Sequence, residues 1–321
     1  MIKVINNMQG VVNKYLLGLK SWQEPDINTY YFDRYLQIET DNYSLNADTF
    51  TPKIAYVNEY TEPLISTVTI SGTTNPVSGI GVNFTISTYP AGAEGFSLSK
   101  SSETTNNQGI ADVQLKLGNI PAEYGVTATC PVCVPEFSSV TFTCCGKLKT
   151  DEFRQGDNRW GNIQLGTHPP HYLIRQTGCA LTSVANLINF YANINPNIAR
   201  TDPAILNQQM TNLNIYNNND DVLWYRVPVI TNRNIRYIGG ISVDPEHTRD
   251  SLLEQIDRDL LRGLPVIIHS VRANGRDHFM LAIGRCERRY IVVDPATGVV
   301  DNYDPNNPQL ILQGVHRYEP R

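Results

Sequence analysis

The chain lacks any apolar run long enough to cross a bilayer, so no membrane span is expected. It also lacks an excess of positive charge: 26 Lys and Arg residues stand against 31 Asp and Glu residues, a formal net charge of -5. Proteins that bind nucleic acid usually have a basic face for the phosphates, so this balance argues against nucleic acid as a main partner. The amino terminus lacks a basic region followed by an apolar core and a small-residue cleavage site, so no export signal is visible in this chain.

The length of 321 residues is enough for two or three domains, each with its own core. The sequence shows no internal repeat. Its basic residues form one local cluster, for which a solvated surface position is expected. The members of this cluster are Arg272, Arg276, Arg285, Arg288 and Arg289.

Cysteine is scarce, but four of the six cysteines are bunched. The bunch is Cys130, Cys133, Cys144 and Cys145. These four cysteines could form disulfides, bind zinc or remain reduced thiols. Zinc is the least favoured, because two of these cysteines are adjacent and no histidine lies beside them. Cys286 stands apart from the bunch and is expected to be packed or exposed, and unreactive.

Residues 63–147 lack helical periodicity and show short alternating apolar and polar runs instead. The runs are ISTVTISG, GVNFTIS, GIADVQLKLG, YGVTATC and SSVTFTC, with Gly, Asn and Pro between them. This pattern predicts an all-β sandwich. Residues 1–62 are harder to interpret: residues 11–19 could form a short amphipathic helix, and residues 30–60 could supply extra strands or be the remnant of an upstream module.

Part of the predicted sandwich resembles a known family. The runs NPVSGIGVNFTIS, TTNNQGIADVQLKLG and YGVTATC are similar to the bacterial immunoglobulin-like modules of invasin-type surface proteins. Such modules are spacers or adhesive units and carry no chemistry. The resemblance therefore implies contact with a cell-surface or cell-wall component, and an extracellular or cell-surface location.

Residues 150–321 follow a polar segment and change to a mixed pattern of helices and strands. CALTSVANLINFYA, which starts at Cys179, has its apolar residues on one helix face. A second helix is expected after Asp202 and Pro203, and a third from Thr248 until Gly263. The runs PVIIHSV, HFMLAIGRC and YIVVDP then predict an antiparallel meander.

Cys179 lies in the first turn of the predicted helix, where free N–H groups and the positive end of the helix dipole stabilise a thiolate. Gly178 before it lets the chain approach closely and leaves space for a substrate carbonyl. A small buried cysteine that packs under a helix is the alternative. His278 opens one strand of the meander and Asp294 ends the next, so antiparallel pairing can bring the two together. A carboxylate there would orient the imidazole and stabilise its cation.

These residues stand in an order that resembles the bacteriocin-processing, papain-like cysteine peptidases of family C-thirty-nine and their broader relatives. The similar runs are QGDNRWGN, TGCALTSVANLINFY, GLPVIIHSV and DHFMLAIGRCERRYIVVDPATG. The resemblance implies an α+β papain-like fold in which Cys179 is the nucleophile, His278 its base and Asp294 the group that orients the base. It also implies that Gln155 donates a hydrogen bond to the oxyanion. No metal or organic cofactor is implied.

Gln176, three residues before the cysteine, is the rival to Gln155. In the dedicated bacteriocin processors the glutamine lies only a few residues upstream and a transporter domain follows, and this chain departs from both features. Trp160 is expected to pack the Gln155 loop. The remaining histidines look structural, with His168 and His171 in a loop and His247 placed to cap a helix.

The sequence therefore predicts an all-β immunoglobulin-like sandwich followed by a papain-like cysteine hydrolase that cleaves peptide or amide bonds through a thioacyl-enzyme. A wall-peptide amidase, a deamidase and a transamidase share that intermediate and stay open. A surface binding protein with an inactive peptidase-like domain is the alternative from another class.

Overall fold

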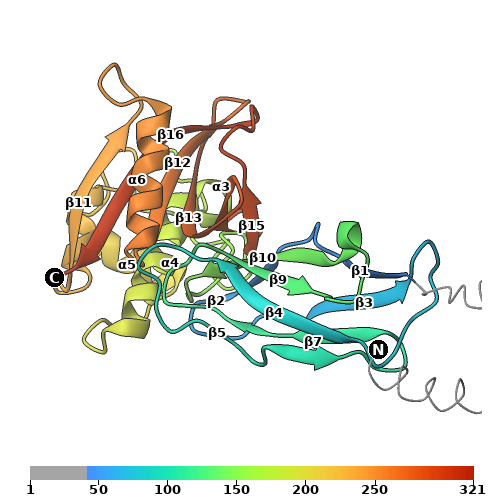
Figure 1. The fold of residues 1–321 in the computed structure, drawn as a ribbon. Helices are drawn as coiled ribbons and strands as arrows, with labels where there is room; N and C mark the ends of the chain where they lie inside the picture. Colours follow the sequence, from blue (N-terminus) through green and yellow to red (C-terminus); the bar gives the residue numbers. More distant parts are fainter. Residues whose placement is uncertain (1–41) are drawn as a thin grey trace, which may run out of the picture. The chain divides into compact units, whose positions relative to one another are not determined.

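The computed structural model describes residues 42–321, and the helix expected at residues 11–19 lies outside them. Strands occupy the first part of the described chain (Figure 1). They are β1 (Tyr43–Ala47), β2 (Lys53–Tyr56), β3 (Leu64–Ile70), β4 (Gly81–Thr88), β5 (Ser97–Leu98), β6 (Ser102–Thr104), β7 (Ile110–Val113), β8 (Leu115–Lys116), β9 (Glu123–Thr129) and β10 (Ser139–Lys147), with the 3-10 turn η1 (Pro135–Phe137) before β10.

Helices and strands mix in the second part. The helical segments are α3 (Ile174–Thr177), α4 (Cys179–Ile194), α5 (Pro203–Asn212), the 3-10 segment η2 (Trp224–Val229) and α6 (Arg249–Leu261). The strands are β11 (Ile235–Ser242), β12 (Val266–Arg272), β13 (Asp277–Cys286), β14 (Arg289–Asp294), β15 (Val299–Tyr303) and β16 (Leu310–Pro320).

The first part is a sandwich whose two layers of strands share one core. β1, β3 and β7 form an antiparallel sheet, while β10, β9, β4 and β6 are neighbours in the other layer. Both layers contribute to the same apolar cluster, for example Leu64 and Val68 from β3 and Val126 and Ala128 from β9. Buried residues alternate with more exposed ones in β3, as in any strand with one face on a core. The expected all-β architecture is confirmed.

Strands before residue 63 add to these layers. β1 pairs with β3, with Tyr43 opposite Ile70, and β2 runs parallel to β10, with Lys53 opposite Cys144. Residues 43–56 therefore extend the sandwich beyond the start expected at residue 63.

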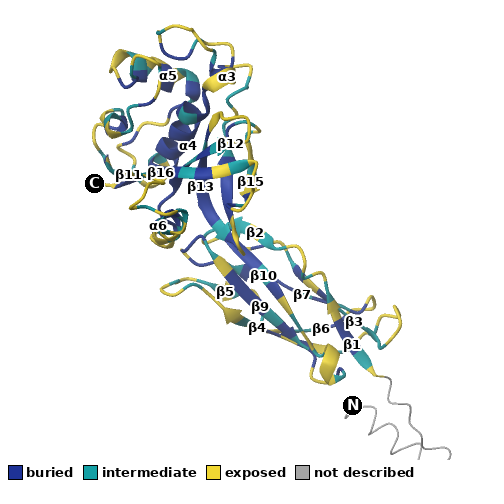
Figure 2. Ribbon diagram, turned by 90° about the horizontal axis from the view of Figure 1, so that it is seen from above, coloured by how far each residue is buried: buried dark blue, intermediate teal, exposed yellow. Residues whose placement is uncertain are grey.

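The second part places a sheet between two helices. The strand order is β11-β16-β12-β13, and β14 and β15 continue from β13. Ile267 of β12 joins the core cluster that contains the buried face of α4, while its neighbours Val266 and Ile268 join that of α6, so the two helices cover opposite faces. Figure 2 shows α4 almost entirely buried. The expected antiparallel meander is confirmed by the pairing of β13 with β12 and β14.

Capping side chains set where α5 and α6 begin. The Asp202 carboxylate accepts a hydrogen bond from the amide of Ile205 at 2.8 Å, and the Thr248 hydroxyl accepts one from the amide of Ser251 at 3.3 Å. Gly263 follows α6 with a φ of 72°, a left-handed conformation that favours glycine. The helix boundaries expected from the sequence are confirmed here.

β10 links the two parts, because it pairs with β9 along most of its length and with β13 at its last residue. Its last residue, Lys147, lies opposite Gly284, and the amide of Leu148 donates to the carbonyl of Ile283 at 2.7 Å. A Cβ on Gly284 would collide with the carbonyl of Gly146. Glycine is therefore needed for this close approach of the two strands.

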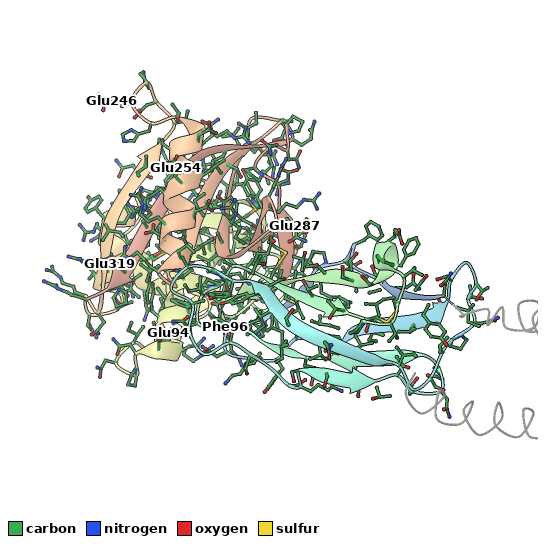
Figure 3. All side chains as sticks on the ribbon, in the orientation of Figure 1. Glu94, Phe96, Glu246, Glu254, Glu287 and Glu319 are labelled. Carbon is green, nitrogen blue, oxygen red and sulfur yellow. A yellow bond between two sulfur atoms is a disulfide. The ribbon has the colours of Figure 1, made fainter. Side chains whose placement is uncertain are left out.

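Two disulfides account for four of the six cysteines. Cys130 is bonded to Cys133, and Cys145 is bonded to Cys286 (yellow bonds in Figure 3). Cys286 was expected to be packed or exposed, and it is buried. Its disulfide with Cys145 was not predicted, because it depends on β10 and β13 being neighbours in the fold. Cys144 is a free thiol buried in the sandwich core. Among residues 42–321, no helix is both long and apolar enough to span a membrane.

Candidate active site

Cys179 is the first residue of α4, directly after the short helix α3. The first N–H groups of a helix have no acceptor within that helix and point toward its amino-terminal end, where they favour a negative charge. The cysteine is 8% exposed. A Cβ on Gly178 would collide with the carbonyl of Ile174, so glycine is required to pack α3 against the start of α4. The expected close approach of the chain at Gly178 is thus confirmed, and the space for a substrate carbonyl stays a prediction.

His278 and Asp294 meet as expected from the meander. The Nε2 atom of His278 lies 2.8 Å from Oδ1 of Asp294, and both side chains are largely shielded from solvent. The register explains the contact, because Leu281 lies opposite Val293 and each partner lies beyond that pair at the same end of the hairpin.

The charge state of His278 depends on both proposed partners. Burial lowers its pKa, but hydrogen bonds to Asp294 and Cys179, together with the charges of these two groups, outweigh burial and raise the pKa from 6.5 to about 9. Burial raises the pKa of Asp294, but its hydrogen bond to His278, the histidine charge and the amide of Ala296 outweigh burial and hold that pKa below its ordinary value. At neutral pH these contacts favour an imidazolium beside a carboxylate.

The turn after Asp294 is fastened to the Gln155 loop. The amide of Gln155 donates to the carbonyl of Pro295 at 2.8 Å. Gly298 has a φ of 70°, and a Cβ there would collide with the side chain of Arg154. The Pro-Ala-x-Gly run of the sequence thus ends in a glycine that both the backbone conformation and the close contact require.

The two candidate glutamines have different surroundings. The side chain of Gln155 donates from Nε2 to the carbonyl of Arg175 at 3.0 Å, and its Oε1 is buried without a partner among the described residues. Gln176 instead accepts through Oε1 from the amide of Leu173 at 2.8 Å and so caps α3. Of the two glutamines, only Gln155 bonds both α3, which precedes Cys179, and the turn after Asp294.

Trp160 packs the Gln155 loop, as predicted. It is 1% exposed, and its Nε1 donates to the carbonyl of Arg154 at 2.7 Å. Its ring meets Phe153 edge to face, with 5.4 Å between the centroids. An indole held in this way supports the loop and is not open to substrate.

Other histidines lie outside the Cys179 site. His168 pairs with Asp220 at 2.8 Å. His316 stacks on Trp224 with 3.8 Å between the rings, and burial lowers its pKa to about 3. The expectation that His247 caps α6 was wrong, because Thr248 occupies that position. Within residues 42–321, no group of three or more His, Cys, Asp or Glu side chains could hold a metal ion.

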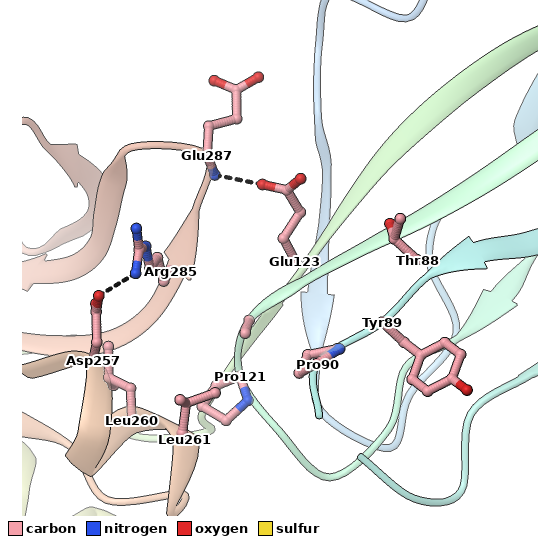
Figure 4. A pocket seen from close by; sticks show the side chains of 11 residues that line it. Thr88, Tyr89, Pro90, Pro121, Glu123, Asp257, Leu260, Leu261, Arg285 and Glu287 are labelled. Atoms are coloured by element: carbon pink, nitrogen blue, oxygen red, sulfur yellow. Dashed lines mark hydrogen bonds and ion pairs between the residues drawn. The ribbon is translucent and has the colours of Figure 1, made fainter. Parts of the chain in front are cut away.

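A separate cavity of about 410 Å³ lies where the sandwich loops meet α6 and the β13–β14 turn (Figure 4). Tyr89 and Pro121 line its sandwich side, and Leu261 lines its α6 side. The amide of Glu287 donates to the Glu123 carboxylate at 2.9 Å at its rim. None of the four candidate catalytic residues lines this cavity, so it is distinct from the Cys179 site.

The model of the Peptidase_C39 like family matches residues 156–318. No curated protein matches the chain. Among solved structures, the D00-D0 domain of intimin shares 23% identity, with 32% of this chain and 45% of that chain covered and a TM-score of 0.25.

Two further structures are similar over part or most of the chain. An intimin carboxy-terminal fragment in complex with the intimin-binding domain of its translocated receptor shares 25% identity, with 40% and 39% coverage and a TM-score of 0.23. The Yersinia pseudotuberculosis adhesin InvE shares 7% identity, with 87% and 70% coverage and a TM-score of 0.28. The chain spans less than half the length of both intimin structures. The family model covers just over half of the chain, which therefore belongs to the Peptidase_C39 like family.

Proposed function

We propose that this protein is a cysteine hydrolase that cleaves a peptide or amide bond through a thioacyl-enzyme, with Cys179, His278, Asp294 and Gln155 as its catalytic residues. The observation that carries the proposal is the position of His278. Its ring bonds Asp294, and Asp294 together with Cys179 raises the pKa of the ring to about 9 despite burial. A thiolate beside an imidazolium is the reactive form of a cysteine nucleophile.

The chemistry follows from these positions. The Cys179 sulfur attacks the substrate carbonyl, and the resulting oxyanion accepts from the Cys179 amide and from Gln155. An amide nitrogen has two N–H groups, so Nε2 of Gln155 can bond the Arg175 carbonyl with one and the oxyanion with the other. His278 gives its proton to the leaving amine, and the C–N bond breaks to leave a thioester. Water, deprotonated by His278, then attacks the thioester and releases the acid and the thiolate.

Asp294 would act through the histidine. Its Oδ1 accepts from the amide of Ala296 at 2.8 Å as well as contacting His278, so its orientation is set by the backbone turn. A fixed carboxylate keeps the ring facing the sulfur and stabilises the cation formed during turnover.

The domain arrangement is also a proposal: residues 1–62, an immunoglobulin-like module at residues 63–147, and a papain-like domain at residues 150–321. The start of the family match at residue 156 supports the last boundary. A papain-like arrangement is supported by the order helix-start Cys179, strand-start His278 and strand-end Asp294. Expression of residues 150–321 with Cys286→Ser tests the boundary. A fragment that is soluble only with residues 63–147 attached would reveal a shared core.

We infer a cell-surface or extracellular location, with the immunoglobulin-like module as a spacer or as a contact to a surface or wall component. Two disulfides support this location, since such bonds persist mainly in oxidising compartments. A wall-peptide amidase, a deamidase and a transamidase would use the same thioacyl step.

A cleavage profile tests the proposal. Wild-type and Cys179→Ala proteins are incubated with a peptide library and with cell-wall fragments, and the products are identified by mass spectrometry. Products that depend on Cys179 support a hydrolase and identify the bond cleaved. Equal, unchanged mixtures from both proteins would instead favour an inactive, binding domain.

A further inference from the structure

The fold separates the five arginines that are clustered in the sequence. Arg285 lies near the far end of β13 and forms an ion pair with Asp257 on α6. Arg272 and Arg276 flank the turn between β12 and β13 and are exposed, and Arg276 comes two residues before His278. Only these two of the clustered arginines lie at the end of the hairpin where the candidate active site is.

Two exposed arginines from other segments join this end. Arg154 precedes Gln155, and its side chain packs on Gly298 in the turn after Asp294. Arg175 lies on α3, four residues before Cys179, and its carbonyl accepts from Gln155. We call Arg154, Arg175, Arg272 and Arg276 the arginine rim. Three separate segments of the chain thus place arginine residues near one site.

The rim arginines form no ion pair among the described residues, although the charges of Arg154 and Arg272 help to lower the pKa values of Asp157 and Asp294. Within residues 42–321 no carboxylate forms an ion pair with any of the four. Asp157, in the same loop as Arg154, is already bonded to Arg159, and Asp277 next to His278 is bonded to His269 at 2.7 Å.

An electrostatic effect on Asp294 supports the position of the rim near the candidate active site. The charge of Arg272 is one of the influences that lower the pKa of Asp294, so this guanidinium acts on the catalytic carboxylate. The Arg175 guanidinium donates one N–H to the neutral Asn162 side chain at 2.6 Å, which leaves its other N–H groups available as donors. In a chain of net charge -5, this end of the hairpin therefore carries exposed arginines that form no ion pair among the described residues. A guanidinium matches a carboxylate in geometry and charge.

We propose that the arginine rim recognises carboxylate groups on the substrate, so that the preferred substrates are acidic peptides. This proposal rests on the hydrolase function proposed above. The carboxylate can come from a Glu or Asp side chain near the cleaved bond or from a free peptide carboxyl terminus. Both sources offer the same planar anion, and matched peptides distinguish them.

Binding to Cys179→Ala protein tests the rim without turnover. Calorimetry compares three versions of each library peptide: one with Glu, one with Gln in its place, and one with Gln and an amidated carboxyl terminus. We expect the most acidic version to bind best and its advantage to shrink at high salt, because exposed charges are screened. Arg272→Gln and Arg276→Gln, each in the Cys179→Ala background, should reduce that advantage about three- to tenfold. Arg258→Gln is the matched control and should change nothing, because this exposed arginine lies on α6, which covers the face of the sheet opposite α4.

The outcomes separate the two proposals. A loss of the advantage on Glu to Gln exchange identifies a side-chain carboxylate, and a loss on amidation identifies a terminal one. Equal binding of all versions, an equal effect of Arg258→Gln, or no peptide binding overturns the rim proposal. The hydrolase proposal is judged separately, by Cys179-dependent cleavage in the wild-type protein.

Discussion

Cys145 and Cys286 form a disulfide across 141 residues of sequence, and this bond ties β10 of the sandwich to the end of β13. His278 lies near the other end of the same strand. The strand that carries the proposed catalytic histidine is therefore anchored covalently to the neighbouring part of the chain.

The two disulfides should differ in their contribution to stability. Cys145→Ser with Cys286→Ser opens a loop that spans most of the second part, whereas Cys130→Ser with Cys133→Ser opens a loop of three-residue separation. The chain-entropy model assigns about 5 kcal/mol to the long loop and about 2 kcal/mol to the short one. Urea denaturation of the two double variants measures the difference. Equal losses of unfolding free energy would show that loop length is not what matters here.

Stability should fall as the pH rises from about 6.5 to about 9. His278 has a folded pKa of about 9, above its ordinary value of 6.5, so its contribution is complete below the lower value and is lost through the upper one. A shift of this size corresponds to about 3 kcal/mol of unfolding free energy. Urea denaturation at pH 6 and pH 9.5, with His278→Gln as the reference, measures it. An identical pH dependence in both proteins would contradict the assignment.

Cys179 should be the thiol that iodoacetamide modifies near neutral pH in the folded protein. Four of the other cysteines are in disulfides. Cys144 is buried, and burial raises its pKa to about 12, so it stays protonated and unreactive. His278→Gln should slow alkylation by tenfold or so, because the thiolate loses its counterion. Peptide mapping by mass spectrometry locates the label. Modification of Cys144 with Cys179 untouched would overturn the prediction.

Gln155 and Gln176 should differ in catalysis. Gln155→Ala should lower kcat by about a hundredfold with KM little changed, the usual cost of one lost oxyanion donor. Gln176→Ala removes only a cap on α3 and should be mild. Alkylation of Cys179 develops no oxyanion, so Gln155→Ala should leave its rate nearly unchanged, whereas Asp294→Ala should slow alkylation and turnover together. A large kcat loss in Gln176→Ala beside a normal Gln155→Ala would reverse the assignment.

Local patterns predicted the parts of the fold that local rules govern. The apolar face that starts at Cys179 predicted α4, the cap at Asp202 followed by Pro203 predicted the start of α5, and the amphipathic run from Thr248 to Gly263 predicted α6. The contact of His278 with Asp294 could be predicted because adjacent antiparallel strands keep sequence neighbours near in space.

Long-range pairings were out of reach. Nothing in the sequence around Cys286 indicates that β13 lies beside β10, so its disulfide with Cys145 could not be inferred. The strands at residues 43–56 are short and depend on β3 and β10 for their hydrogen bonds, which leaves little local signal. The contact of Gln155 with the Arg175 carbonyl likewise follows only from the packed loops.

The central claim is that Cys179 forms a thioester with the substrate, and the direct test is mass spectrometry of protein quenched in acid during turnover of a library peptide. The account predicts a mass increase equal to the acyl half of the cleaved peptide, located on the tryptic fragment that contains Cys179. The increase should be absent from Cys179→Ala, which should also release no product. Product release by Cys179→Ala at the wild-type rate would contradict the account.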